Sequence, residues 1–263
     1  MKAYMLFSSS EGNCCYIKSG KEEILIDAGL SAKKISESLL KLGTSLENIS
    51  SIFITHEHID HIRGLNVICR HRRIPVYVPP ESLEFIAASA PWADELLVEN
   101  GNGSSVSVES MKITAFETPH DSLGSVCFRI EDEETALGYA TDIGHLTPNV
   151  RKCLLGCENV VIESNYDSEM LKNGPYPYTI KKRIMGNNGH LSNFDCSNFL
   201  PELVNSGTKN FVLAHLSKTN NKPHIAFAES RGVLNSKGIF VDGSKGKSDV
   251  RLCTALPDEI VEI

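Results

Sequence analysis

The sequence predicts an α/β protein made of two mixed halves, each of which carries both strands and helices. Short apolar runs that are typical of buried strands recur along the chain, as in "EEILI" and "NFVLA". Stretches with helical periodicity follow several of these runs, and turn-forming residues separate the β-rich middle. No linker, low-complexity segment or sequence repeat interrupts residues 1–263, so we expect a single domain.

The N-terminal half is expected to begin with strands and then to alternate helices with strands. The first strand-like runs are "AYMLF", "CYIKS" and "EEILIDAG". A helix is predicted from Ser31 to Leu42, with Ser31 as its N-cap. It is followed by the strand "SIFIT", a helix from Leu65 to Arg72, the strand "PVYVP" and a helix from Glu81 to Ala90.

The C-terminal half is expected to start with β-structure in "VSVESMKITAFETPH", "GSVCFRI" and "ALGYATDIG". The strands "NVVIESN" and "NFVLAHLS" then alternate with predicted helices, and the chain closes with the strands "GIFVD" and "VRLCTA". These helices are predicted over Asn149–Leu155, Tyr178–Met185, Phe194–Asn205 and Ile225–Asn235.

The composition is that of a globular protein, with 41% apolar and 22% charged residues. No apolar run approaches the ~20 residues of a membrane span, and "MKAYMLFSSSEGN" lacks the apolar core of a signal peptide. We therefore expect a cytoplasmic protein without a membrane partner, whose eight cysteines are reduced. The net charge of −7 argues against a generic nucleic-acid coat protein, although basic residues cluster locally, as in "IKKR".

The stretch "THEHIDHIRG", Thr55 to Gly64, concentrates metal-binding residue types directly after the apolar run "IFI". Because the ends of buried strands are where α/β folds place their chemistry, this cluster indicates a metal or catalytic site rather than a solvated loop. His56 and His58 are two residues apart, so on an extended segment they point the same way and bind one ion. If the chain then turns into a helix, Asp60 and His61 are directed to a second position nearby.

Further metal-competent residues follow apolar strands elsewhere in the chain. His120 comes after "ITAFETP", Asp142 after "LGYAT" and His215 after "NFVLA". Because four ligands are too few for two ions, these residues are the expected remainder of a dinuclear site. Imidazole nitrogen and carboxylate oxygen suit Zn²⁺, and also Mn²⁺ or Fe²⁺. The sequence thus predicts two divalent metal ions, zinc, manganese or iron.

This series of motifs resembles the metallo-β-lactamase-fold hydrolases, which carry an early strand-end Asp, HxHxDH, and then a His, an Asp and a final His. The pattern runs in this order from Asp27 in "LIDAG" to His215. The resemblance implies a four-layer αββα sandwich, in which two mixed β-sheets are flanked by helices. It also implies that Asp27 braces the cluster loop without binding metal; an ordinary strand-end Asp is the alternative. The implied ligands are His56, His58 and His120 for the first ion, Asp60, His61 and His215 for the second, and Asp142 for both.

A pair of divalent ions determines the expected chemistry. Two dications a few ångströms apart lower the pKa of a shared water from about 15.7 towards neutrality and offset charge on a phosphoryl or acyl centre. Hydrolysis is therefore expected, with Asp60 among the catalytic residues. The diiron oxidases of this fold carry an acidic residue where this chain has His58, so redox chemistry is not expected.

Two residues outside the metal pattern narrow the reaction class. Glu163 ends the strand in "VIESN", and His190 lies in "NGHLSN" before a helix capped by Ser192. Singly, each has a structural alternative, as a salt-bridged strand end or a loop histidine. Together they resemble the phosphodiesterases of the superfamily, above all the ribonuclease Z group. That resemblance makes His190 the general acid or a phosphate clamp, and it makes Glu163 the residue that holds the ring and raises its pKa.

Over nearly its whole length the sequence resembles the YycJ-like (VicX or WalJ) branch of bacterial proteins. The resemblance rests on "SSSEGN", on "ESNYD…PYP…KKRI…GHLSN" and on "HLSKTNN". It implies a nuclease with 5′→3′ exonuclease action on DNA rather than RNA, with links to DNA repair. Tyr166 departs from the pattern, because a His is expected there. The expected substrate contacts are Lys181, Lys182, Arg183 and Ser192, since charge supplies most of the affinity for a nucleic-acid backbone.

Three functions stay open on the sequence alone. The first is the dinuclear nuclease. The second is a small-molecule hydrolase of the same fold, acting on a thioester, lactone or cyclic phosphodiester; it needs no His190 and fits the acidic net charge better. The third is a non-enzymatic regulatory adaptor, against which the intact ligand set argues. The "SSSEGN" turn either binds an anion or simply joins two strands, and the sequence indicates no oligomeric state.

Overall fold

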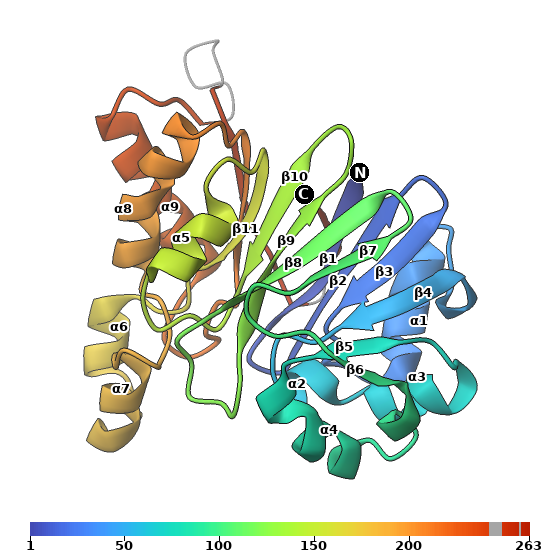
Figure 1. Cartoon of the computed structure of the whole chain (residues 1–263). Coiled ribbons are helices and arrows are strands. Elements are labelled where there is room, and N and C mark those ends of the chain that lie inside the picture. Colours follow the sequence, from blue (N-terminus) through green and yellow to red (C-terminus); the bar gives the residue numbers. More distant parts are fainter. Residues whose placement is uncertain (242–248, 258) are drawn as a thin grey trace.

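Two seven-stranded sheets pack face to face, with helices on both outer surfaces, in the computed structural model of residues 1–241, 249–257 and 259–263 (Figure 1). The first sheet consists, in spatial order, of β14 (Val261–Glu262), β1 (Lys2–Ser9), β2 (Gly12–Ser19), β3 (Glu22–Ile26), β4 (Ile49–Phe53), β5 (Val76–Val78) and β6 (Leu97–Glu99). The second consists of β13 (Arg251–Thr254), β12 (Asn210–Ala214), β11 (Asn159–Glu163), β10 (Ala136–Ala140), β9 (Val126–Glu131), β8 (Met111–Glu117) and β7 (Ser105–Val108).

The helices are divided between the two sheets. The helices beside the first sheet are α1 (Ala32–Lys41), α2 (Ile59–Ile62), α3 (Leu65–His71) and α4 (Leu83–Ser89). Those beside the second are α5 (Pro148–Leu154), α8 (Asn193–Asn205) and α9 (Pro223–Ser236), with α6 (Ser168–Asn173) and α7 (Tyr178–Ile184) at its lower end in Figure 1. Single 3₁₀ turns cover Leu46–Asn48, Pro80–Ser82 and Asp94–Leu96.

Three apolar layers hold the sandwich together. The central layer lies between the sheets, where Phe53 of the first sheet meets Phe128 of the second edge-on at 5.8 Å between ring centroids. A second layer packs Ile35 and the rest of the buried face of α1 against the outer surface of the first sheet. The third packs residues such as Leu200 of α8 against the outer surface of the second sheet. The predicted four-layer αββα class is confirmed, with an apolar layer at each of its three interfaces.

Within each sheet, several strands run in the same direction and end at the same edge. In the first sheet β1, β3 and β4 run the same way, because β2 is antiparallel to both β1 and β3 while β3 and β4 are parallel. In the second sheet β8, β10, β11 and β12 likewise share one direction. The carboxyl ends of these strands therefore meet at one edge of each sheet, which is where open α/β sheets bind their ligands.

Most predicted elements lie within one or two residues of the observed ones. Ser31 caps α1, as expected, by accepting a hydrogen bond from the backbone N–H of Lys34 at 3.3 Å. Three short elements were not predicted: α6, β6 and β14. The expected strand "GIFVD" is wrong over its described part, because only Val241 forms an isolated bridge there, with Val250, and Asp242 lies outside the described residues.

Two compositional expectations also bear on the structure. All eight cysteines lie among the described residues, and seven of them are buried. In the described part of the chain, every helix is too short or too polar to pass through a bilayer.

Candidate metal centre

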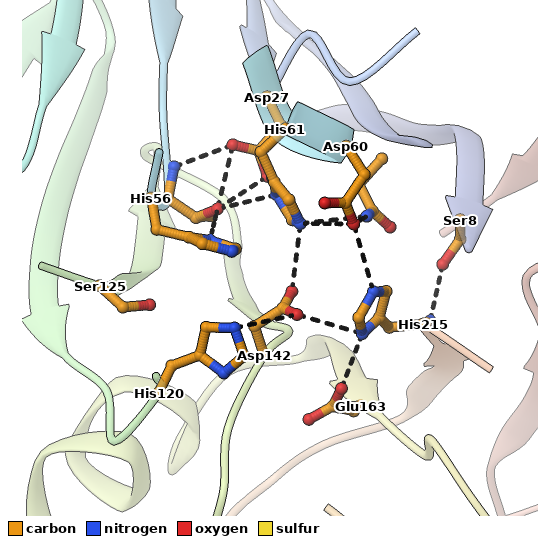
Figure 2. A network of polar contacts seen from close by, with 12 residues as sticks. Ser8, Asp27, His56, Asp60, His61, His120, Ser125, Asp142, Glu163 and His215 are labelled. Carbon is orange, nitrogen blue, oxygen red and sulfur yellow. Dashed lines mark hydrogen bonds and ion pairs between the residues drawn. The ribbon is translucent and has the colours of Figure 1, made fainter. Parts of the chain in front are cut away.

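Three of the predicted strand-end residues have an unusual backbone conformation. Asp27 follows β3, Asp142 follows β10 and His215 follows β12, and their φ angles are 61°, 56° and 55°. For a residue other than glycine, this left-handed region costs about 1–3 kcal/mol and persists only where the surroundings fix it. Such strain is typical of functional sites, and here the bends turn the Asp142 and His215 side chains toward one another (Figure 2).

The side chains assigned to the first ion converge. One ligand atom from each of His56, His58 and His120 lies within 4.8 Å of the other two. The ring of His56 lies 4.6 Å from that of His58 and 4.9 Å from that of His120, between centroids. His58 ends the extended segment and begins α2, so the predicted turn into a helix occurs directly after the HxH pair.

The side chains assigned to the second ion form another group. Ligand atoms of Asp60, His61 and His215 also lie within 4.8 Å of one another. Asp142 stands between the two groups: its Oδ2 is 3.3 Å from His61 Nε2, and its Oδ1 is 3.7 Å from His120 Nε2. A carboxylate in this position could be shared by metal ions bound at the two groups.

Hydrogen bonds on the far side of two rings fix which nitrogen faces the cluster. His61 Nδ1 is 2.7 Å from Asp27 Oδ2, and a carboxylate accepts only, so Nδ1 carries the hydrogen. The Thr55 hydroxyl donates to Asp27, which leaves its oxygen to accept from His56 Nδ1 at 3.0 Å. In the neutral form of each ring the hydrogen is therefore on Nδ1 and Nε2 is bare, which is the tautomer that binds a metal through Nε2.

The same arrangement holds for two further rings. His120 Nδ1 donates to the carbonyl oxygen of Gly189 at 3.2 Å, and His215 Nδ1 donates to Glu163 Oε1 at 2.7 Å. Each Nε2 is thus an acceptor directed into the cluster.

Several of these atoms are buried without a hydrogen-bond partner, which tests whether the residues fit a metal. Among the buried side-chain atoms of the described residues that make no hydrogen bond are His56 Nε2, His120 Nε2, His215 Nε2 and Asp142 Oδ2. An unsatisfied buried acceptor costs free energy unless something binds it. Imidazole and carboxylate donors at this spacing fit divalent cations such as Zn²⁺ or Mn²⁺.

Asp27 lies where the sequence predicts, behind the cluster. Its fully buried carboxylate accepts from the backbone N–H of Thr55 at 2.8 Å as well as from His61. Burial raises the pKa of Asp27 even though His61 opposes the shift, and the neighbouring carboxylates raise the pKa of His61 despite its burial. Asp27 has no place in the groups that could hold a metal.

Glu163 and His190 are also in contact, as the sequence predicts. Glu163 Oε1 accepts a hydrogen bond from His190 Nδ1 at 2.8 Å, in addition to the one from His215. Its other oxygen, Oε2, accepts from the backbone N–H groups of Ile143 at 2.8 Å and Leu191 at 3.1 Å. Burial alone raises the pKa of Glu163, but these histidines outweigh it and lower the pKa to about 2. Burial also lowers the pKa of His190, and the Glu163 carboxylate outweighs it and raises that pKa above the ordinary value.

His190 stands at the border of the cluster. Its ring lies 5.2 Å from that of His120 and 5.3 Å from that of His215, and its side chain is 22% exposed. With Asp142, Glu163 and His215 it forms a further group with metal-ligand spacing. In that group, however, His190 directs Nδ1 at Glu163, so its Nε2 is the nitrogen available to a substrate.

Ser10 of "SSSEGN" lines the pocket, and two other residues of this segment, Ser8 and Asn13, form hydrogen bonds within the site. The hydroxyl oxygen of Ser8 accepts from the backbone N–H of His215 at 2.7 Å, which holds the strained strand end (Figure 2). The side-chain amide of Asn13 donates to Asp60 Oδ2 at 3.3 Å and lies 3.1 Å from His61 Nε2. The turn therefore supports the second group.

Glu57 occupies the variable position between His56 and His58, and the structure shows which groups its side chain contacts. Its buried carboxylate accepts from the hydroxyl of Ser82 at 2.7 Å and from the backbone N–H of Leu123 at 2.8 Å. It thereby ties the segment between His56 and His58 to the loop that follows His120.

The expected substrate contacts have different surroundings. Arg183 lines a pocket of about 330 Å³ that includes His120 and His190. Lys181 instead donates to the backbone carbonyl of Lys172 at 2.6 Å. Lys182, in the middle of α7, is exposed and does not line the pocket.

The geometry gives Ser192 a helix cap rather than a substrate contact. Its hydroxyl oxygen accepts a hydrogen bond from the backbone N–H of Asp195 at 3.0 Å. The same hydroxyl donates to the side-chain carboxylate of Asp195 at 2.6 Å. Ser192 does not line the pocket. Tyr166, at the position that departs from the family pattern, is buried, forms a bridge with Ser192 and does not line the pocket.

Comparison with known proteins agrees with this arrangement. Residues 22–216 match the beta-lactamase superfamily domain. The chain is 31% identical to the exodeoxyribonuclease YycJ of Bacillus anthracis over 240 residues, which cover 90% of each chain. It is 30% identical to the exodeoxyribonuclease WalJ of Streptococcus pneumoniae over 230 residues, 86% of this chain and 85% of the relative.

The fold has a solved counterpart in the metallo-beta-lactamase fold protein YhfI of Bacillus subtilis. The two structures align with a TM-score of 0.72 at 14% sequence identity, over 100% of this chain and 98% of that one. The chain therefore belongs to the beta-lactamase superfamily, as a metal-dependent hydrolase of the family that includes YycJ and WalJ.

Proposed function

We propose that this protein is a metal-dependent 5′→3′ exonuclease that acts on DNA. The observation that carries the proposal is the His190–Glu163 pair: His190 lines the pocket beside two groups of metal-competent side chains, and the buried Glu163 carboxylate accepts from its Nδ1. The names of YycJ and WalJ, both exodeoxyribonucleases, support DNA as the substrate.

The ligand assignment follows the two groups. His56, His58 and His120 would hold one ion, Asp60, His61 and His215 the other, and Asp142 both. Divalent cations at these positions would lower the pKa of water and offset negative charge on a phosphate. The bare Nε2 atoms and the buried Asp142 carboxylate are the donors that this role needs.

The remaining chemistry belongs to His190. When the P–O bond breaks, the leaving oxygen needs a proton, and an imidazolium whose Nε2 faces the pocket can donate it. Glu163 fixes the ring through Nδ1 and favours the charged form, since its carboxylate lies 2.8 Å away. Because Glu163 also holds His215, one carboxylate positions both the proton donor and a metal ligand.

The first test compares labelled DNA substrates. With Mn²⁺ or Zn²⁺, the protein is expected to release the label of 5′-labelled duplex DNA at once and to leave 3′-labelled fragments that shorten progressively. RNA, a thioester and a lactone are assayed in parallel. Hydrolysis of either ester without any metal-dependent shortening of DNA would instead favour the small-molecule hydrolase.

A variant tests the role of His190. His190→Ala should lower kcat on DNA by about 10²- to 10⁴-fold, because it removes the general acid, while mass spectrometry finds the metal content of the wild type. His71→Ala is the matched control, since His71 is an exposed residue at the end of α3. DNA cleavage by His190→Ala at the rate of the control would contradict the phosphodiesterase assignment.

A further inference from the structure

One face of α7 forms part of the wall of the catalytic pocket. Ile180, Arg183 and Ile184 all line it, and they are spaced i, i+3 and i+4, so they lie on one side of the helix. The adjacent Lys182 is on a different face. The helix therefore directs Lys181, Lys182 and Arg183 to different sides. Of these three basic side chains, Arg183 is the one that lines the pocket.

The charge of the pocket makes Arg183 distinctive. Asp60, Asp121 and Asp142 line the pocket together with four histidines, and Arg183 is the one arginine or lysine among the described residues that do so. The whole chain carries a net charge of −7. A polyanionic strand that enters the pocket thus meets, apart from any bound metal, one permanently cationic side chain.

The guanidinium of Arg183 is held in place by Asp121, which also lines the pocket. Its Nε donates to Asp121 Oδ2, and Asp121 follows His120, whose Nε2 lies 3.5 Å from Asp121 Oδ1. Arginine has five N–H donors, and its Nη atoms donate to no other described residue. They remain available for a phosphate, which the planar guanidinium binds through paired hydrogen bonds.

The flanking isoleucines supply a different kind of contact. Ile180 is 38% exposed and Ile184 is half-buried, so the helix presents apolar surface on either side of the guanidinium. Apolar surface beside a phosphate-binding group matches a nucleotide, in which an anionic phosphate is joined to a sugar and a planar base. A thioester or a lactone offers no such phosphate.

We propose that the face of α7 formed by Ile180, Arg183 and Ile184 binds the nucleotide next to the cleaved bond, with its phosphate on Arg183. This inference rests on the proposed nuclease function and adds a subsite to it. Asp121 is a positioning residue, which keeps the guanidinium turned toward the pocket.

The test compares two substrates that differ in the presence of a neighbouring nucleotide, a DNA oligonucleotide and bis(4-nitrophenyl) phosphate. In Arg183→Gln, the ratio of kcat/KM for the oligonucleotide to that for the ester should fall about five- to twenty-fold, as expected for a lost charge-assisted hydrogen bond at an open site. The slope of log kcat/KM against log salt concentration should also decrease by about 1.

Arg73→Gln is the matched control. Arg73 pairs with Glu95 and its side chain is 61% exposed, against 60% for Arg183, but it does not line the pocket. This control should keep the wild-type substrate ratio. Lys182→Gln removes a charge next to Arg183 on another face of α7, and an equal fall in that variant would overturn the proposal in favour of diffuse attraction.

The remaining outcomes are also decisive. If Arg183→Gln fails to fold, Asp121→Asn is tested in its place, because this variant keeps the Arg183 cation but removes the carboxylate that positions it. The ratio of kcat/KM for the oligonucleotide to that for the ester should again fall. A wild-type ratio in Asp121→Asn would overturn the subsite. A wild-type protein that hydrolyses the ester but no DNA or RNA would refute the nuclease function itself, whatever the α7 variants do.

Discussion

At single residues, the site depends on which nitrogen of each imidazole carries the hydrogen. His61 is an example, because Asp27 accepts from Nδ1 and thereby leaves Nε2 bare for a cation. Asp27 also occupies a left-handed backbone conformation, which asparagine tolerates better than most residues.

Asp27→Asn therefore isolates the electrostatic role. Its side-chain oxygen can still accept from Thr55, but its amide N–H₂ faces His61 Nδ1 and favours the tautomer with hydrogen on Nε2. We expect an affinity for the second ion that is about 10- to 100-fold weaker, measured by metal titration of the purified variant. Wild-type affinity for both ions would contradict this role.

The predicted ligands were found in the sequence because each follows a recognisable strand. The sequence did not predict the roles of Ser8, Asn13 and Glu57. Each of these side chains acts through a partner that is distant in the chain, as Ser8 does with His215. Hydrogen-bond partnership of this kind is fixed by packing, and no local pattern encodes it.

At the level of elements, the site depends on connections between loops. Glu57 lies between His56 and His58 and accepts from Leu123 in the loop after β8, which carries His120. The two segments supply all three ligands assigned to the first ion, so this carboxylate fixes their separation.

Glu57→Ala tests that connection. The variant leaves the hydroxyl of Ser82 and the N–H of Leu123 without their acceptor, so unfolding in urea should show a loss of about 1–3 kcal/mol. Metal titration should show weaker binding of the first ion, and Glu57→Gln, which keeps one acceptor, should bind more tightly than Glu57→Ala. Equal metal affinity in Glu57→Ala and the wild type would show that the loops are positioned independently.

Short elements were the least predictable from the sequence. β14 has two residues and is defined by its pairing with β1, from the other end of the chain. Over the described part of "GIFVD" the pairing is limited to the isolated bridge between Val241 and Val250, so the apolar run alone did not predict the extent of pairing. The longer helices were predicted closely because their periodicity is local.

For the whole molecule, the strand–helix order was enough to predict an α/β class, and the family resemblance supplied the four layers. Neither the strand–helix order nor the resemblance predicted how the two sheets meet. Strands of one direction are β1, β3 and β4 in the first sheet, and β8, β10, β11 and β12 in the second. Their shared directions bring the carboxyl ends of both sets to one place. Asp142, from the second sheet, can then reach His61, from the first.

The stoichiometry of bound metal is the most direct test of this convergence. Native mass spectrometry of the protein loaded with Zn²⁺ or Mn²⁺ should find two ions per chain in the wild type, one in the Asp60→Ala/His61→Ala double variant, and fewer than two in Asp142→Ala. A wild-type chain that binds no ion, or a double variant that keeps both, would contradict the proposed dinuclear centre.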